Sequence, residues 1–166
     1  PYRIPNKYFD NEKIIDICTT NRSSYARTAS DEIYGWGNND IGQLGDTTTT
    51  DKYRPTKMQG WDPVANNGIA VWQIQGSGDD GWVTLLDGNG YIWNCGENNY
   101  GNFGDGTTTN NTQLTKTEVA PGGDIVDLWS MYWNGYKVAF YRTKDGTTYH
   151  AGHSGTFRNG GTGNTG

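Results

Sequence analysis

A segment of about 20 residues occurs twice in this chain, and such repetition constrains the fold more than any other feature of a sequence. Shifting the sequence by 59 positions places Ile33 on Ile92. The other matched pairs are Tyr34/Trp93, Gly37/Gly96, Asn39/Asn98, Gly42/Gly101, Leu44/Phe103, Gly45/Gly104, Asp46/Asp105 and the threonines 48–50/107–109. This many coincidences indicate a structural repeat and not a bias in composition.

A third, weaker copy lies 56 positions after the second, where residues 145–152 align with residues 89–96. After Gly152 the match decays into a glycine-rich stretch that we expect to be irregular or to terminate the array. We therefore predict one repeat domain over residues 1–166, with units at approximately 14–56, 71–115 and 125–160. Repeat units of this kind stack on one another to bury a continuous core, and three units are near the minimum for stability.

Each unit has the pattern of short β-strands joined by tight turns. Apolar segments at 14–17, 71–74 and 125–129 open the three units, and residues 82–86 and 91–95 give two further strands in the second unit. Asp-Gly and Asn-Gly at residues 87–90 form the strongest short-range signal for a hairpin turn. Because no apolar set repeats at a spacing of three and four residues, no helix is expected. The fold class is all-β.

Glycines at fixed spacing mark the end of the repeated strand. They are Gly37, Gly42 and Gly45 in the first unit, and Gly96, Gly101 and Gly104 in the second. We predict that these six have structural roles, at positions of positive φ or of close approach between chain segments. The large apolar surface that the core needs comes from 7 Trp and 11 Tyr residues, since each buried ring removes about 150–250 Å² from water.

The segment from Ile33 to Asp46 resembles the regulator of chromosome condensation repeat, whose pattern is Y-x-W-G-x-N-x-x-G-Q-L-G. The resemblance is close in the first unit, good in the second and partial in the third, and it covers most of residues 14–152. It implies a β-propeller of four-stranded blades, with one sequence repeat shared between neighbouring blades. Trp82 and Val138 depart from the small polar or histidine residue that is common at this position of the family.

The number of repeats also departs from the family, whose members usually have about seven. Closed propellers typically need 4–8 blades. We therefore expect a β-propeller-like array of about three blades that is either a partial propeller, part of a larger ring, or a ring completed by several chains. The composition of the repeat, which is rich in Thr, Asn, Gly and aromatic residues, resembles that of bacterial or phage surface proteins of this class more than that of eukaryotic nuclear ones.

Several functions are disfavoured by the residues themselves. The net charge of −5 argues against nucleic-acid binding, because that affinity rests on basic side chains. His150 and His153 are the only histidines, and zinc needs three or four protein ligands. Asp79 and Asp80 lack the spacing of a calcium loop. No cofactor, metal or membrane insertion is predicted, and we expect the chain not to be an enzyme. Cys18 and Cys95 are either small buried thiols or a disulfide pair.

Four aromatic residues outside the strand pattern are candidates for binding, namely Trp61, Trp129, Tyr132 and Trp133. Rings on loops can stack on sugars or fill pockets of a protein partner, although the same rings could instead cap the blade cores. We expect a non-enzymatic binding or structural module of an extracellular surface or a virion, such as a phage tail fibre. It would act on protein neighbours, in an assembly or homo-oligomer, or on surface glycans. The alternative is a cytoplasmic fragment of a regulatory propeller that binds a small GTPase or inhibits an enzyme.

Overall fold

The computed structural model describes residues 2–66, 68–77, 81–119, 124–133 and 135–153, which form three antiparallel sheets. We call these sheets blades 1, 2 and 3. Blade 1 contains β1 (Ile14–Thr19), β2 (Ser23–Thr28), β3 (Ile33–Gly37) and β4 (Lys52–Lys57). Blade 2 contains β5 (Val71–Gly76), β6 (Trp82–Asp87), β7 (Ile92–Gly96) and β8 (Asn111–Thr117). Blade 3 contains β9 (Ile125–Trp133), β10 (Tyr136–Thr143) and β11 (Thr148–Gly152). The predicted all-β array of three blades is confirmed, with three strands described in blade 3.

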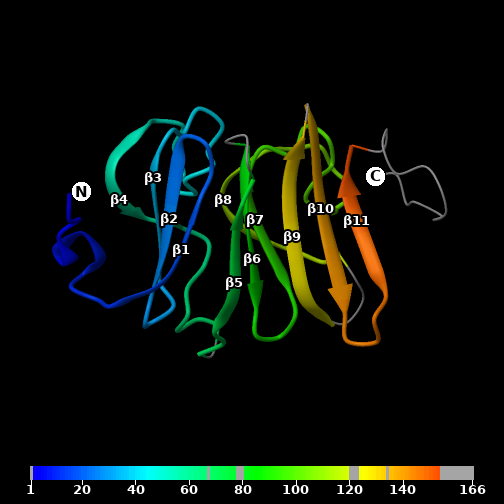
Figure 1. Cartoon of the computed structure of the whole chain (residues 1–166), viewed down its shortest axis with the longest axis horizontal. Coiled ribbons are helices and arrows are strands. Elements are labelled where there is room, and N and C mark those ends of the chain that lie inside the picture. Colours follow the sequence, from blue (N-terminus) through cyan, green and yellow to red (C-terminus); the bar gives the residue numbers. More distant parts are fainter. Residues whose placement is uncertain (1, 67, 78–80, 120–123, 134, 154–166) are drawn as a thin grey trace.

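The blades stand side by side in chain order, as Figure 1 shows from left to right. Strand pairing repeats in the same register, because Ser23 lies opposite Gly37, Trp82 opposite Gly96, and Val138 opposite Gly152. These three pairs define equivalent positions in the three blades. The pairing of the first and second strands of each blade is also interrupted at the same place by an irregularity of register.

The hydrophobic core lies between the blades. One cluster joins blades 1 and 2 and includes Tyr25, Ile33, Leu44, Ile74 and Leu85. A second cluster joins blades 2 and 3 and includes Trp82, Ile92, Phe103, Leu128 and Tyr141. β6 is buried at all six positions because it is covered by a blade on either side. This explains why apolar residues occur on both faces of β6, as Trp82, Val83, Leu85 and Leu86, and do not alternate strictly with polar ones.

Glycine closes the third strand of every blade where another chain segment passes close to it. All six glycines singled out from the sequence have positive φ. A Cβ atom on Gly37 would lie 2.2 Å from the carbonyl oxygen of Arg22, and one on Gly96 would lie 2.4 Å from that of Gly81. The backbone at these positions therefore requires the absence of a side chain.

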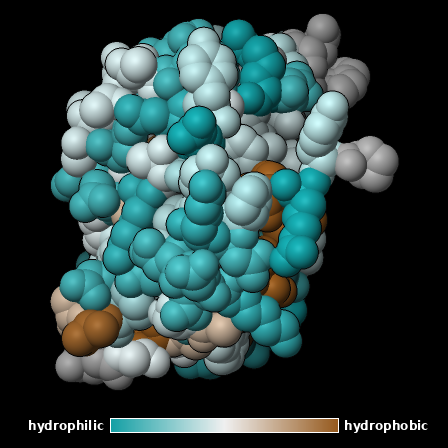
Figure 2. Space-filling view, turned by 90° about the vertical axis from the view of Figure 1, so that its left-hand side faces the viewer, coloured by the Kyte–Doolittle hydropathy of each residue, from teal (hydrophilic) through white to brown (hydrophobic). Residues whose placement is uncertain are grey.

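The N-terminal segment covers part of blade 1. Residues Asn6–Phe9 form a short 3₁₀ helix, η1, which the sequence did not predict. Phe9 is buried and its ring meets that of Tyr34 edge to face at 5.4 Å. This left-hand side of the molecule is mostly hydrophilic with a few hydrophobic patches (Figure 2). In the described part of the chain, no helix is long and apolar enough to cross a membrane.

Candidate binding surfaces

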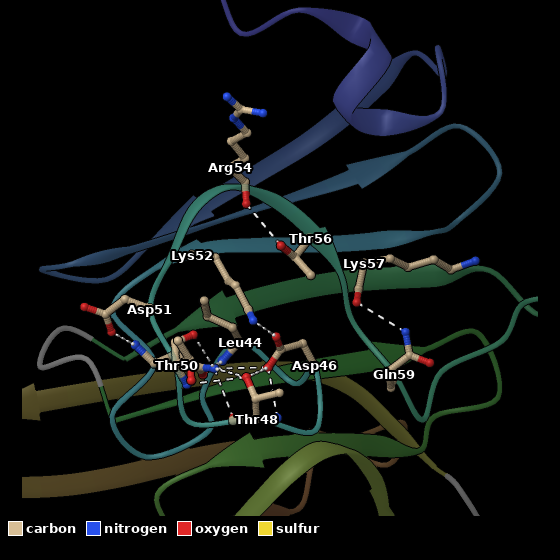
Figure 3. A network of polar contacts seen from close by, with 11 residues as sticks. Leu44, Asp46, Thr48, Thr50, Asp51, Lys52, Arg54, Thr56, Lys57 and Gln59 are labelled. Atoms are coloured by element: carbon tan, nitrogen blue, oxygen red, sulfur yellow. Dashed lines mark hydrogen bonds and ion pairs between the residues drawn. The ribbon is translucent and has the colours of Figure 1, made fainter.

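The loop after β3 is held by the side chain of Asn39, which is fully buried. Its Nδ2 atom donates to Asp46 Oδ1 and to the carbonyl oxygen of Thr48, both at 3.0 Å, while its Oδ1 atom accepts from the backbone N–H of Leu44 at 2.8 Å. Figure 3 shows Asp46, Thr48 and Thr50 gathered around this network. One amide thus ties together the two sides of a loop of irregular backbone.

Blade 2 repeats this network at the matched positions. Asn98 Nδ2 donates to Asp105 Oδ1 at 3.3 Å and to the carbonyl oxygen of Thr107 at 3.1 Å. Its Oδ1 atom accepts from the N–H of Phe103 at 2.9 Å. The repeated Asn, Asp and Thr residues are therefore structural, and the two aspartates accept hydrogen bonds within their loops.

Asp46 is also paired with a cation. Its Oδ2 atom lies 2.8 Å from Lys52 Nζ at the start of β4. Burial opposes ionisation of this carboxyl group, but hydrogen bonds from Lys52, Thr48 and Asn39 outweigh it and lower the pKa of Asp46 below its ordinary 3.8. The ionised carboxylate of Asp46 thus holds the first residue of β4 in place.

β4 borders a shallow hollow of about 440 Å³. Its lining is Asp51, Lys52, Tyr53, Arg54 and Thr56. The side chain of Tyr53 is almost wholly exposed, at 95 %. Arg54 points away from the polar network (Figure 3), and its guanidinium group lies over the ring of Tyr8 at 5.3 Å. Tyr53 and Arg54 are thus neighbours on β4 that both line this hollow, next to the residue that the loop network holds.

The equivalent strand of blade 2 has no such side chains. Gly37 lies opposite Lys52 in blade 1, and Gly96 lies opposite Asn111 in blade 2, so β4 and β8 occupy equivalent places. Along them the sequence reads K-Y-R-P-T-K in β4 and N-T-Q-L-T-K in β8. Thr112 and Gln113 thus stand where blade 1 has Tyr53 and Arg54. The fold does not require an exposed tyrosine and arginine at these two positions.

Trp61, one of the four predicted binding residues, is not available at the surface. It is only 3 % exposed and belongs to the core between blades 1 and 2. Its ring meets that of Trp93 edge to face at 5.2 Å, and its indole N–H donates to the carbonyl oxygen of Asp31 at 2.8 Å. The connection that carries Trp61 passes between two blades, so this ring caps the core. For Trp61 the structure therefore favours the second of the two expected roles, capping of the core, over binding.

The other three predicted rings lie on β9. Trp129 is 48 % exposed and lies opposite Phe140 on the face of blade 3 that points away from blade 2. Tyr132 is half-buried and lies opposite Lys137. Trp133 ends the strand, and its side chain lies outside the described part of the structure. The structure therefore does not bring the four predicted residues together into one site.

The described residues do not offer a cluster of metal ligands. No three of their His, Cys, Asp or Glu side chains gather as ligands for a metal ion. Cys18 and Cys95 are both free thiols. Burial raises the pKa of Cys18 to about 12 and also raises that of Cys95, so neither supplies a thiolate nucleophile near neutral pH. Asp79 and Asp80 lie outside the described residues.

The blades and their register define the class of fold, which is that of the propellers built from regulator of chromosome condensation (RCC1) repeats. Residues 30–66 match the model of this repeat. Yeast Prp20p from Saccharomyces cerevisiae, described together with its binding properties to Gsp1p and histones, aligns with a TM-score of 0.70 at 20 % identity over 90 % of this chain. Human WBSCR16 aligns with a TM-score of 0.69 at 16 % identity over 86 % of this chain.

Two curated proteins are similar in sequence. The human E3 ubiquitin-protein ligase HERC2 is 28 % identical over 84 % of this chain, and the ultraviolet-B receptor UVR8 of Arabidopsis thaliana is 27 % identical over 78 % of it. The chain spans only 3 % of HERC2 and 28 % of UVR8, and about a third of the solved structures, namely 34 % of Prp20p and 33 % of WBSCR16. It thus corresponds to a segment of each relative.

Proposed function

We propose that this chain is a non-enzymatic protein-binding module, a section of an RCC1-type propeller, and that it contacts its partner through the hollow beside β4. The observation that carries the proposal is the difference between β4 and β8. At equivalent positions of the two strands, β4 displays Tyr53 and Arg54, whereas β8 has Thr112 and Gln113. Tyrosine and arginine are enriched among the residues that dominate the energy of protein interfaces.

Charge defines the kind of partner surface that fits. Arg54 makes no ion pair within the described part of the chain, and Lys7 lies over the same Tyr8 ring at 5.3 Å. Two cations therefore flank one exposed edge of a chain whose net charge is −5. We infer that this edge binds an acidic segment of a folded protein, because complementary charges orient the approach of the partner.

Of the two functions expected from the sequence, we carry forward the regulatory one. Prp20p is described with the partners Gsp1p and histones, and we propose that this chain binds a small GTPase, with Gsp1p as the probe. The proteins named above include no component of a virion or a surface structure, and glycan contact has no support from them. Ligase activity is not proposed, because the chain covers 3 % of HERC2.

The test is the affinity of the chain for purified Gsp1p, measured by biolayer interferometry. The double variant Tyr53→Thr/Arg54→Gln takes the residues that blade 2 already has, so it keeps the fold. We expect it to bind about tenfold more weakly or worse, which corresponds to about 1.4 kcal/mol. The matched control is Thr112→Ala/Gln113→Ala on β8, for which the affinity stays as in the unmodified chain.

Two results would contradict the proposal. One is an unmodified chain that does not bind Gsp1p. The other is that both double variants bind Gsp1p with the affinity of the unmodified chain, which would exclude the hollow as the binding site. The affinity of the chain for histones is measured in parallel. Because histones are basic, they would bind an acidic patch elsewhere on the molecule, and not the basic edge proposed here.

A further inference from the structure

Five buried polar atoms at the interface of blades 2 and 3 have no hydrogen-bond partner among the described residues. They are Trp82 Nε1, Thr84 Oγ1, Asn94 Oδ1, Asn102 Oδ1 and Ser130 Oγ. The other two such atoms of the described part, on Arg27 and Glu32, belong to blade 1. A polar atom that is buried and unpaired costs its full desolvation energy, so buried polar atoms normally have a partner. These five atoms therefore point to a partner other than the described residues.

Two of the five atoms are neighbours on one face of blade 2. Thr84 lies on β6 between Trp82 and Leu86, which belong to the core between blades 2 and 3, and side chains alternate along a strand. Thr84 therefore faces blade 3. Asn94 lies directly opposite Thr84 on β7, and opposite residues have Cβ atoms about 4.5–5.5 Å apart. One small molecule can thus contact both side chains.

The remaining three atoms line the same interface. Trp82 is part of the core cluster between blades 2 and 3. Ser130 lies opposite Ala139, which belongs to that cluster, so the side chain of Ser130 points toward blade 2. The hydroxyl group of Tyr141 in blade 3 donates to the backbone carbonyl oxygen of Asn102 at 3.5 Å. Both blades therefore contribute polar atoms to this layer.

The interface of blades 1 and 2 fills the equivalent place with a ring. From the register of the blades, Tyr25 and Gly35 hold the places of Thr84 and Asn94. Tyr25 is fully buried, and its hydroxyl group donates to the carbonyl oxygen of Gln43 at 3.0 Å. A Cβ atom on Gly35 would lie 3.3 Å from this ring. Direct contacts between residues thus satisfy this place at the first interface, and they do not at the second.

We propose that ordered water molecules bind between blades 2 and 3. One water molecule bridges Thr84 Oγ1 and Asn94 Oδ1, and another accepts from the indole N–H of Trp82. This inference is independent of the hollow beside β4.

The chemistry of the five atoms favours water over an ion. An indole N–H only donates, an amide oxygen only accepts, and a hydroxyl group does both, so a ligand that both donates and accepts is needed. None of the five side chains is charged, and a cation could not accept from Trp82. Buried water molecules typically make about three hydrogen bonds to such groups, and proteins hold about one for every 27 residues.

The first test is the sign of the effect of Thr84→Val on stability. This variant keeps the shape of the side chain and removes its hydroxyl group, so a bridging water molecule would lose a partner. We expect the midpoint of urea unfolding to fall. The matched control is Thr28→Val, which must lower the midpoint, because Thr28 is also fully buried and its Oγ1 atom accepts from the N–H of Glu32 at 3.1 Å. If Thr84 Oγ1 instead has no partner, Thr84→Val raises the midpoint or leaves it unchanged.

The second test detects the water directly by nuclear magnetic resonance. The indole proton of Trp82, identified by its loss in Trp82→Phe, should show a nuclear Overhauser contact to water although this residue is 0 % exposed. Measurement in the rotating frame separates such a contact from proton exchange. The control is the indole proton of Trp61, which is 3 % exposed and donates to the carbonyl oxygen of Asp31, and for which we expect no contact.

Either test can overturn the proposal. A midpoint that Thr84→Val raises or leaves unchanged would mean that no water molecule bonds to its hydroxyl group. A Trp82 proton with no more contact to water than that of Trp61 would mean that the interface is dry. A lowered midpoint together with a dry interface would show that another part of the chain satisfies these atoms. Circular dichroism of each variant shows whether it is folded before its result is interpreted.

Discussion

At the scale of single residues, the loops depend on amides that are buried and fully used. Asn39 and Asn98 each satisfy donors and acceptors on both sides of their loops. We predict that Asn39→Ala lowers the free energy of unfolding by about 2 kcal/mol or more, because the partners left behind are buried and unsatisfied. Urea unfolding measures this. The control Asn89→Ala changes an exposed side chain, and a similar loss in that variant would contradict the account.

Asp46 gives the loop of blade 1 a dependence on pH. The pKa of its carboxyl group is lowered in the folded chain below the ordinary 3.8. A lowered pKa contributes stability that is present above the unfolded value and is lost as the pH falls through the folded value. We therefore expect Asp46→Asn to be destabilised relative to the unmodified chain at neutral pH, with the difference narrowing below about pH 4. Urea unfolding across this range checks the sign, and a difference that widens in acid would contradict it.

At the scale of the strand and its closing turn, the decisive feature is the close approach at each terminal glycine. Gly96 and Gly106 both have positive φ, but a Cβ atom on Gly96 would meet backbone whereas one on Gly106 would meet nothing within 4 Å. We predict that Gly106→Ala costs about 1 kcal/mol from φ alone. Gly96→Ala should lower the free energy of unfolding by at least about 2 kcal/mol more, because the new Cβ atom would clash with backbone, which cannot shift without disrupting the strand pairing. Thermal unfolding compares the two variants. Equal losses of stability would show that the close approach of backbone to Gly96 does not contribute.

The individual strands differ in how well the sequence predicts them. β3 (Ile33–Gly37) and its counterpart β7 (Ile92–Gly96) could be predicted from the matched residues, because their apolar positions are buried and each strand ends at a glycine. β4 and β8 were implied only by the family resemblance, since exposed, polar edge strands have no apolar alternation of their own. The two roles expected of Trp61 could not be separated from the sequence, because it does not show that the connection carrying this residue passes between two blades. The difference between Tyr53 and Arg54 in β4 and their counterparts in β8 follows from the register of the two strands, which the sequence does not give.

At the scale of the whole molecule, buried contacts tie the blades into one unit. The ammonium group of Lys137 in blade 3 pairs with Glu97 beside blade 2, and both side chains are less than 10 % exposed. Breaking a buried pair on one side leaves an uncompensated charge and costs about 3–5 kcal/mol. We predict such a loss for Lys137→Met, whereas the exposed pair Lys144–Asp124 should contribute less than about 1 kcal/mol. Chemical unfolding monitored by tryptophan fluorescence compares Lys137→Met with Lys144→Met.

We propose above that the edge of blade 1, and not its equivalent in blade 2, meets a protein partner. Hydrogen–deuterium exchange of the chain with and without Gsp1p tests this claim directly, because it reports both edges in one experiment. We expect slower exchange on binding in the peptide that contains Lys52–Lys57, and no change in the peptide that contains Asn111–Thr117. Protection of β8 without β4, or no protection of either, would contradict it.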